Sequence, residues 1–369
     1  MKKNLILSLA CAVLVLASAF ALSSCGKKAE IAVVTDVGLL MDGGFNQGTW
    51  EGAEGYAKAN GKTVQYYQPA NGADATDADR ITAMQTAIKN GAKVIVTPGF
   101  LQAAAIETVA KENPEVKFVF VDGWNFGPEY KNVTAISYKE EESGFFAGYA
   151  AVKDGYTKLG GTFGGGGTNP ACSRFAYGFA QGANAAAAEM NKTVEVKISF
   201  KYGSTFGAST ELATQIAGWY SNGTEIVFAC GGSMVQSVIS AAEATTNGKV
   251  IGVDVDQAGL SDRVLTSAVK GLAVSVEQVL GQFYAGEWDA KLADKTQNLG
   301  AAVDATGLPT ASSSWRFATF TKAEYDQLFA KVKNGSLTIK NDIADNCDDV
   351  EFWAAVNTAC ANANISLDK

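Results

Sequence analysis

The sequence contains no histidine, and it has few prolines and fewer basic than acidic residues. Without histidine, Ser–His–Asp triads, histidine general bases and histidine metal sites are excluded. The chain carries 30 Lys and Arg against 38 Asp and Glu, a net charge of −8. Because nucleic-acid surfaces need clustered Lys and Arg, we expect no nucleic-acid partner. The 39 glycines, against only 6 prolines, favour many tight turns between strands and helices.

The first residues have the layout of a bacterial secretory signal. Lys2 and Lys3 precede a mostly apolar stretch from Leu5 to Leu22. The stretch leads into Leu22-Ser-Ser-Cys25, which resembles a lipobox, in which the cysteine is lipidated and becomes the mature N-terminus. The alternative is a transmembrane helix, but the stretch is near the lower length limit and no charge cluster follows it. We expect a signal peptide over 1–24, lipidation of Cys25, a tether over 25–30, and anchoring on the extracytoplasmic face of the cell membrane.

Four cysteines lie beyond this tether: Cys172, Cys230, Cys347 and Cys360. Outside the cytoplasm they could form two disulfides, and three connectivities are open. Cys347 and Cys360 flank a predicted C-terminal helix and are the favoured pair. Cys230 ends an apolar run and is equally well explained as a buried small hydrophobe. The spacing contains no Cys-x-x-Cys pair, which argues against a zinc site.

From residue 31 onward, short apolar runs alternate with segments of helical spacing about every 30 residues. Ile31–Val34 is rich in β-branched residues and predicts a buried strand. Glu140–Val152 predicts a helix whose small residues allow close packing. The last units predict a helix over Lys322–Lys333 and a strand over Leu337–Ile339. Buried strands alternating with helices predict an α/β fold with parallel sheets covered on both faces.

The length of 369 residues exceeds what one compact core usually uses, so we expect two Rossmann-like lobes. Turn signals near Gly155 and Gly271 set their boundaries. The N-terminal lobe is expected over 31–155 with a returning segment over about 272–300. The C-terminal lobe is expected over 156–271 with a returning segment over about 301–340, followed by a tail over 341–369.

In open parallel sheets, ligands bind at the carboxyl ends of the strands, so the residues just past each predicted strand are informative. In this sequence they are polar, acidic, aromatic or glycine. They are Asp36, Asp122, Phe206, Gly231-Gly232, Asp254 and Asp256. Between two hinged lobes, such strand ends face one another across a cleft, which is the geometry of a binding protein.

Several motifs follow one another along the chain: Ile31-Ala-Val-Val-Thr-Asp36, Asp42-Gly-Gly-Phe45-Asn46-Gln47, Phe120-Val-Asp122, Ser143-Gly-Phe-Phe-Ala-Gly148, Arg174-Phe-Ala-Tyr-Gly-Phe-Ala-Gln-Gly182, Ala229-Cys-Gly-Gly232, Ile251-Gly-Val-Asp254-Val-Asp256-Gln257 and Leu265-Thr-Ser-Ala-Val-Lys270. In order and spacing they resemble the basic membrane protein family, the PnrA-like purine nucleoside receptors. The resemblance spans about Ile31 to Ile339. It implies a type I periplasmic binding protein-like fold and a lipid-anchored substrate-binding protein that delivers a nucleoside to the permease subunits of an ABC transporter.

The resemblance implies that Phe45 and Phe206, one from each lobe, sandwich a flat base. The alternative for each ring is core packing. Asp36 and Asn46 are then suited to read the base edges, because a carboxylate accepts hydrogen bonds and an amide both donates and accepts. A turn cap is the alternative role for Asp36, and the N-cap of the following helix is the alternative for Asn46.

For the sugar, the resemblance implies that Asp122 and Asp254 accept hydroxyl hydrogens. Lys270 donates to a sugar oxygen or pairs with Asp254. Asp256 alternates with Asp254, so one of the two side chains can face away from the ligand. Gly231-Gly232 lets backbone N–H groups approach the ligand. The alternative for Asp122 and Asp254 is a solvated turn, and the alternative for Lys270 is a position on the surface.

Enzymatic readings find little support. Gly160–Gly167 does not fit G-x-G-x-x-G, and Gly61-Lys62-Thr63 lacks the upstream glycine of a P-loop. Without histidine no nucleophile–base pair is visible, so we expect no catalysis and no cofactor. The remaining alternatives are a binding protein for a sugar or autoinducer, and a sensor or host-interaction lipoprotein. The run Gly164–Gly167 and the cysteine-bearing tail depart from the family pattern. We expect a monomer.

Overall fold

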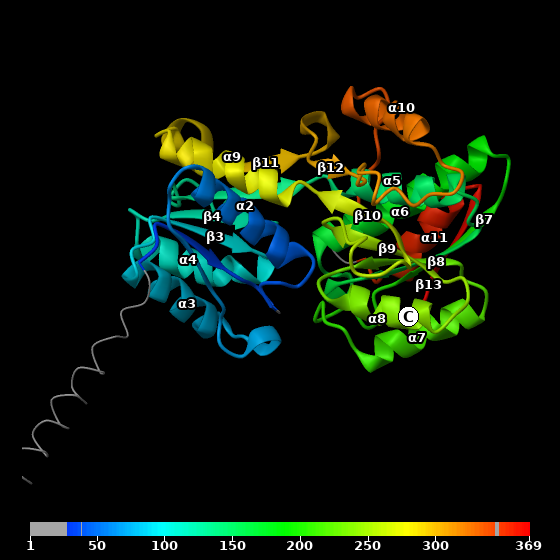
Figure 1. The fold of residues 1–369 in the computed structure, drawn as a ribbon, viewed down its shortest axis with the longest axis horizontal. Helices are drawn as coiled ribbons and strands as arrows, with labels where there is room; N and C mark the ends of the chain where they lie inside the picture. Colours follow the sequence, from blue (N-terminus) through cyan, green and yellow to red (C-terminus); the bar gives the residue numbers. More distant parts are fainter. Residues whose placement is uncertain (1–27, 38, 344–346) are drawn as a thin grey trace, which may run out of the picture.

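The computed structural model describes residues 28–37, 39–343 and 347–369. Two lobes lie side by side, each with a β-sheet covered by helices on both faces (Figure 1). This largely parallel α/β architecture confirms the predicted fold class. The predicted signal peptide and Cys25 lie outside the described residues. Within the described ranges, no helix combines the length and the apolar character needed to cross a membrane.

The N-terminal lobe contains a six-stranded parallel sheet in the order β11-β5-β4-β3-β1-β2. Its strands are β1 (Ile31–Val34), β2 (Val64–Tyr67), β3 (Val94–Pro98), β4 (Lys117–Val121), β5 (Val133–Tyr138) and β11 (Lys295–Leu299). The helices that cover it are α2 (Phe45–Ala59), α9 (Leu272–Tyr284), α3 (Asp77–Lys89) and α4 (Ala103–Glu112). The first two pack on one face and the last two on the other, so apolar strands such as β1 are fully buried.

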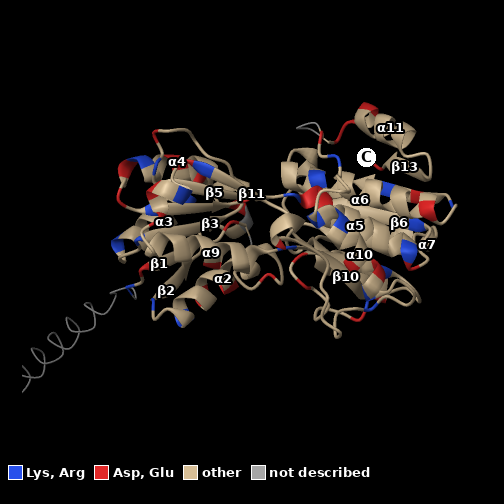
Figure 2. Cartoon of the chain, turned by 90° about the horizontal axis from the view of Figure 1, so that it is seen from above, with Lys and Arg blue, Asp and Glu red and all other residues tan. Residues whose placement is uncertain are grey.

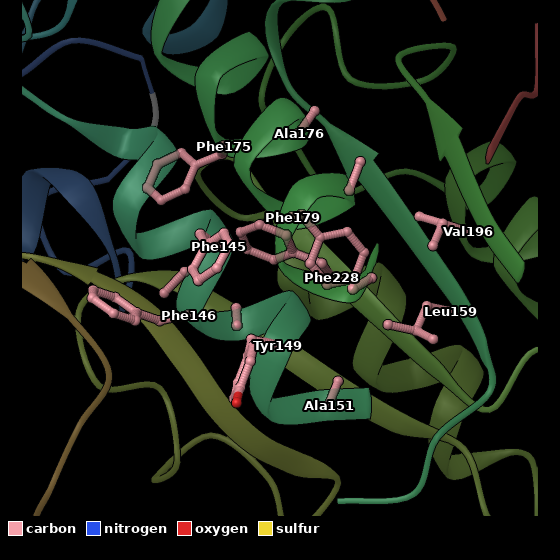
Figure 3. Packing of buried hydrophobic residues seen from close by; sticks show 14 of the residues in the cluster. Phe145, Phe146, Tyr149, Ala151, Leu159, Phe175, Ala176, Phe179, Val196 and Phe228 are labelled. Carbon is pink, nitrogen blue, oxygen red and sulfur yellow. The ribbon is translucent and has the colours of Figure 1, made fainter. Parts of the chain in front are cut away.

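The C-terminal lobe contains a seven-stranded sheet in the order β12-β10-β9-β8-β6-β7-β13, in which only the β10–β12 pair is antiparallel. Its strands are β6 (Lys158–Phe163), β7 (Val194–Ser199), β8 (Ile226–Cys230), β9 (Lys249–Asp254), β10 (Val264–Lys270), β12 (Thr306–Gly307) and β13 (Ala363–Leu367). Its helices are α5 (Glu140–Lys153), α6 (Pro170–Glu189), α7 (Thr210–Ser221), α8 (Met234–Glu243), α10 (Lys322–Lys333) and α11 (Val350–Ala359). The aromatic core of this lobe lies between the α5–α6 pair and the sheet (Figure 3).

Helices α5 and α6 pack with their backbones almost in contact, as their small residues predict. A Cβ atom on Gly144 would lie 2.3 Å from the Phe175 carbonyl oxygen, and one on Gly178 would lie 2.1 Å from the Glu141 carbonyl oxygen. Helix α6 begins at Pro170, after Asn169, whose side chain accepts the Cys172 N–H at 2.9 Å. This rigid pair places the start of α6 at the interface between the lobes.

The described chain crosses between the lobes at three places: from β5 into α5, from β10 into α9, and from β11 into β12 through the short helix η5 (Ala301–Val303). The other short helices are η1 (Gly72–Asp74), η2 (Phe100–Gln102), η3 (Gly165–Gly167) and η4 (Trp288–Leu292). The lobes also touch beyond the crossings, because the Gln257 side chain donates to the Gly43 carbonyl at 2.8 Å. Basic and acidic residues are distributed over both lobes (Figure 2).

The end of the chain differs from the sequence prediction. Leu337–Ile339 was predicted as a strand, but it is irregular, and the Leu337 N–H instead closes the end of α10 by donating to the Lys331 carbonyl at 2.9 Å. The last strand of the chain is β13, which pairs in parallel with β7. Its alternating residues Ala363 and Ile365 are buried, so the tail completes the edge of the sheet.

Candidate ligand site between the lobes

A cavity of about 580 Å³, partly open to solvent, lies where the carboxyl ends of the strands in the two lobes meet. Nine of the ten predicted site residues line it: Asp36, Phe45, Asn46, Asp122, Phe206, Gly231, Gly232, Asp254 and Lys270. In the sequence, these residues are spread over more than 200 positions, from Asp36 to Lys270. The fold brings them into one cavity, and their contact with a ligand stays a prediction.

The aromatic walls of the cavity come from both lobes. Phe45 begins α2 and is partly buried against the core of the N-terminal lobe. Phe206 lies between β7 and α7 and is partly buried against the core of the C-terminal lobe. A third ring, Phe100 of η2, lies across the cleft, with its centroid 6.2 Å from that of Phe206 in an edge-to-face arrangement. Each ring is therefore held by its own lobe while its other surface borders the cavity.

A buried charge cluster forms the base of the cavity. The Lys270 ammonium lies 2.6 Å from Asp122, 3.3 Å from Glu140 and 3.7 Å from Asp254. Arg174 donates from Nε to the second oxygen of Glu140 at 2.6 Å. The Lys270 residue is only 6% exposed, so the surface-lysine alternative is wrong. Three carboxylates thus share two cations in an environment where water is scarce.

The same burial shifts the protonation of the acids. Desolvation raises the pKa of Asp254 to about 7, although the neighbouring Lys270 acts in the opposite direction. Desolvation also raises the pKa of Asp122, again against the effect of Lys270. The pKa of Lys270 is raised because the attraction of Asp122, Glu140 and Asp254 outweighs the cost of burying its charge. Without further hydrogen-bond donors, burial therefore disfavours the ionised forms of Asp122 and Asp254.

Asp36, from the N-terminal lobe, is a further acidic residue of the cavity lining. Desolvation raises the pKa of Asp36 to about 7, and the Arg80 guanidinium, 3.8 Å away, only partly offsets this effect. Among the described residues, Asp36 Oδ1 is buried without a hydrogen-bond partner, and so is Asp122 Oδ1. Buried carboxylate oxygens without partners cost free energy, so both atoms are suited to accept hydrogen bonds from a ligand.

Asn46 shapes the loop beside Asp36. Its side-chain oxygen accepts the Asp36 N–H at 3.3 Å, and its amide donates to the Val37 carbonyl at 2.9 Å. The N-cap alternative for Asn46 is wrong, because it is the second residue of α2. The capping carboxylate is that of Asp42, which accepts the backbone N–H groups of Gly44 and Gln47 at 2.8 and 3.2 Å.

Three of the cavity residues have left-handed backbone conformations that are uncommon for residues other than glycine. The φ angles are 57° for Asp122, 66° for Asp254 and 58° for Phe206. Such conformations are costly, and in proteins they cluster at functional sites. Asp122 and Asp254 lie at the ends of β4 and β9, and Phe206 lies in the loop between β7 and α7.

Asp256 is the one predicted site residue that does not line this cavity. Its side chain is exposed, accepts the Ala258 N–H at 3.1 Å and also accepts a hydrogen bond from Ser314. Asp254 takes the inward direction, and Asp256, two residues on, lies beyond the strand end and ties down the following turn. Of the two alternating acids, Asp254 borders the cavity and Asp256 faces away from it, as the alternation allowed.

The favoured disulfide is also wrong, because no bond joins Cys347 to Cys360. Cys360 is buried at the end of α11, and Cys347 lies at the other end of that helix. Cys172 and Cys230 both border the cavity as thiols, and the Cys172 thiol approaches the Cys230 carbonyl at 3.9 Å. Cys230 thus fits the reading as a buried small residue.

Sequence reasoning missed several residues of the site. Phe100 and Phe175 line the cavity, and Glu140 joins the charge cluster behind it. Phe100 follows β3 and could have been found from the strand-end rule. Glu140 and Phe175 lie on helices, where their spacing is that of ordinary packing residues, so no local signal distinguishes them.

Comparisons with known proteins identify one family. Residues 29–336 match the family model described as ABC transporter substrate-binding protein PnrA-like. The chain is 30% identical over 325 residues to the ABC transporter nucleoside-binding protein BmpA of Lactococcus lactis, covering 82% of this chain and 88% of that protein. It is 26% identical over 300 residues to basic membrane protein B of Borreliella burgdorferi, covering 79% and 84% of the two chains.

Among solved structures, an ABC transporter solute-binding protein from Aeropyrum pernix matches with a TM-score of 0.72 at 20% identity, covering 89% of this chain and 98% of that one. At this identity the match shows the fold alone. The family model, by contrast, covers most of the sequence, including both walls of the cavity. The chain belongs to the PnrA-like family of ABC transporter substrate-binding proteins.

Proposed function

We propose that this protein binds a nucleoside, with preference for a purine base, in the cavity between its lobes and delivers it to its transporter. The observation that carries the proposal is the pairing of two kinds of surface in one cavity. Phenyl rings from both lobes border a space suited to a flat heterocycle, and a buried acidic cluster lies next to them. A nucleoside presents a flat base and a hydroxyl-rich sugar to match the two surfaces.

The charges support a ligand that donates hydrogen bonds and carries no negative charge. Asp122, Glu140 and Asp254 outnumber the two nearby cations, and Asp122 Oδ1 is buried without a hydrogen-bond partner in the part of the chain that the structure describes. Ribose hydroxyl groups would donate to these oxygens, whereas a phosphate group would meet repulsion. The Lactococcus lactis relative, whose description names nucleoside binding, supports the same ligand class.

Delivery to a transporter requires an extracytoplasmic position, and we propose that the lipid on Cys25 provides it. The permease partner follows from family membership, because substrate-binding proteins of ABC transporters pass their ligands to permease subunits. The two lobes then act as a clamp whose closed form presents the ligand. We propose that the protein does this as a monomer, without a cofactor and without catalysis.

Calorimetry tests the ligand class. Adenosine, guanosine, inosine, cytidine, uridine, adenine, ribose and AMP are titrated into the mature protein at pH 7.5. We expect purine nucleosides to bind with micromolar or tighter affinity, about −8 kcal/mol or more favourable. Free adenine and AMP should bind at least tenfold more weakly than adenosine. Binding of ribose alone at comparable affinity would indicate a sugar receptor, and the absence of nucleoside binding would remove the proposal.

A further inference from the structure

The glycine run Gly164–Gly167 and the C-terminal tail contact each other. The family match ends at residue 336, so the tail with α11 and β13 lies outside it. In the fold, the tail passes beside the glycine run at Cys347 and Asp348, where the Cys347 N–H donates to the Gly167 carbonyl at 2.7 Å. Two segments that are far apart in the sequence therefore form one structural feature.

The contact is so close that position 167 accepts only glycine. A Cβ atom on Gly167 would lie 2.6 Å from the Asp348 backbone nitrogen, a distance that real Cβ atoms do not reach. Gly167 also has a φ of +85°, which side chains disfavour. Any larger residue there must move either the glycine run or the tail.

The tail is fixed where it meets the glycine run. The Trp353 side chain is 1% exposed, and its indole N–H donates to the Cys347 carbonyl at 2.8 Å. Further along, β13 pairs with β7 over five residues. Because the tail is held by the core of the C-terminal lobe, it can act as a rigid support for what it touches.

The other end of the glycine run supports the ring of Phe206. A Cβ atom on Gly164 would lie 2.4 Å from Phe206 Cδ1, and one on Gly165 would lie 3.3 Å from Phe206 Cζ. The Gly165 N–H also donates to the Gly203 carbonyl at 2.9 Å, which links the run to the loop that carries the ring. The phenyl ring thus packs directly against the backbone of Gly164 and Gly165.

We propose that the C-terminal tail is a positioning element of the ligand site. Through Cys347 and Asp348 it holds Gly167, and the start of the same run, Gly164 and Gly165, sets the ring of Phe206 at the angle at which it stacks on the ligand. The inference rests on the proposed function, in which Phe206 contacts a nucleoside base. Phe206 is the contacting residue, and the tail acts only through it.

The test compares Gly167→Ala with a matched control, Gly166→Ala. Both positions have positive φ, so both substitutions introduce the same kind of backbone strain. At position 166, however, a Cβ atom would meet only Ser204 at an ordinary 3.7 Å, so the tail is not disturbed. Each substitution is made in the parent protein and in a Phe206→Ala background, and adenosine affinity is measured by calorimetry.

We expect Gly167→Ala to weaken adenosine binding at least tenfold and Gly166→Ala to weaken it less than threefold. In the Phe206→Ala background, Gly167→Ala should change affinity less than threefold, because the ring on which the tail acts is gone. Equal effects of the two glycine substitutions would overturn the inference. The inference would also be overturned if Gly167→Ala weakened adenosine binding equally in the Phe206→Ala background, since the loss would then reflect a general disturbance of the structure.

A measurement without ligand separates this inference from the proposed function. With ¹³C-labelled phenylalanine rings, the signals of Phe206 are assigned by their loss in Phe206→Ala. We expect them to shift in ligand-free Gly167→Ala and to stay in place in Gly166→Ala. Unchanged Phe206 signals in Gly167→Ala would exclude the positioning role, whatever the protein binds. Failure of every nucleoside to bind would remove the proposed function but not a shift of these signals.

Discussion

Replacing Asp254 with asparagine should raise the stability of the ligand-free protein and weaken the binding of ligand. Desolvation raises the pKa of Asp254 from 3.8 to about 7, so ionising this carboxyl group in the folded protein costs free energy. Asparagine keeps the shape and removes the charge. It also tolerates the left-handed conformation of this position, where φ is 66°.

The size of the effect follows from the two pKa values. Because the folded-state pKa lies above the unfolded-state value, the wild-type protein has its full stability from this group below about pH 4. It loses that stability as the pH rises through about 7. The difference between 3.8 and about 7 corresponds to about 4 kcal/mol. We therefore expect Asp254→Asn to raise the free energy of unfolding by up to about 4 kcal/mol at pH 8 and by less than about 1 kcal/mol at pH 4.

Urea unfolding of wild type and Asp254→Asn at several pH values between 4 and 8 measures this difference directly. Asp36 also titrates in this range, but its contribution is common to both proteins and cancels in the comparison. Asp262→Asn, at a fully exposed side chain in the same lobe, is the control, and its effect should stay below about 1 kcal/mol at every pH. Adenosine affinity should fall at least tenfold in Asp254→Asn, because a neutral amide replaces the anionic acceptor. A variant that is less stable than wild type at pH 8, or a difference independent of pH, would refute the reasoning.

Three further predictions concern other parts of the molecule. Lys270→Met should lower the free energy of unfolding by about 3–5 kcal/mol at pH 8, because it leaves buried acids without their cation; a loss below about 1 kcal/mol in urea unfolding would contradict the burial of this charge. Phe45→Ala should weaken adenosine binding by about 1–3 kcal/mol while the circular dichroism spectrum is retained, and unchanged affinity would assign the ring to packing alone. Cys25→Ser should release the protein from the membrane fraction or leave it unprocessed, whereas normal processing and anchoring would exclude the lipobox.

Much of the fold could be predicted because its strands are short, apolar and regularly spaced. β1 was predicted with the bounds that the structure shows, and so was α10, which begins with a capping box from Thr321 to Glu324. The strand β11, by contrast, has the polar sequence Lys-Thr-Gln-Asn-Leu and forms by pairing with β5, more than 150 residues earlier. No local sequence pattern predicts a strand that is stabilised by pairing with a distant segment.

The candidate site was accessible to sequence reasoning where the strand-end rule applies. It placed Asp36, Asp122 and Asp254 at strand ends, and all three line the cavity. The rule fails for contacts made by helices, so Glu140 was missed although it lies 3.3 Å from the Lys270 ammonium. The rule also cannot decide which of two alternating acids faces the cavity. Asp254 borders it and Asp256 does not.

The site combines features that each cost stability in the absence of ligand. Asp122, Asp254 and Phe206 adopt left-handed backbone conformations, and the two acids are buried in a cluster with more carboxylates than cations. A ligand that donates hydrogen bonds to these acids would recover part of that cost only when both lobes surround it. Asp122 comes from one lobe and Lys270 from the other, so their ion pair, at 2.6 Å, joins the two lobes across the cavity. For this reason we expect the affinity of the cavity to depend on closure, and the stabilising substitution at Asp254 to weaken the capture of ligand.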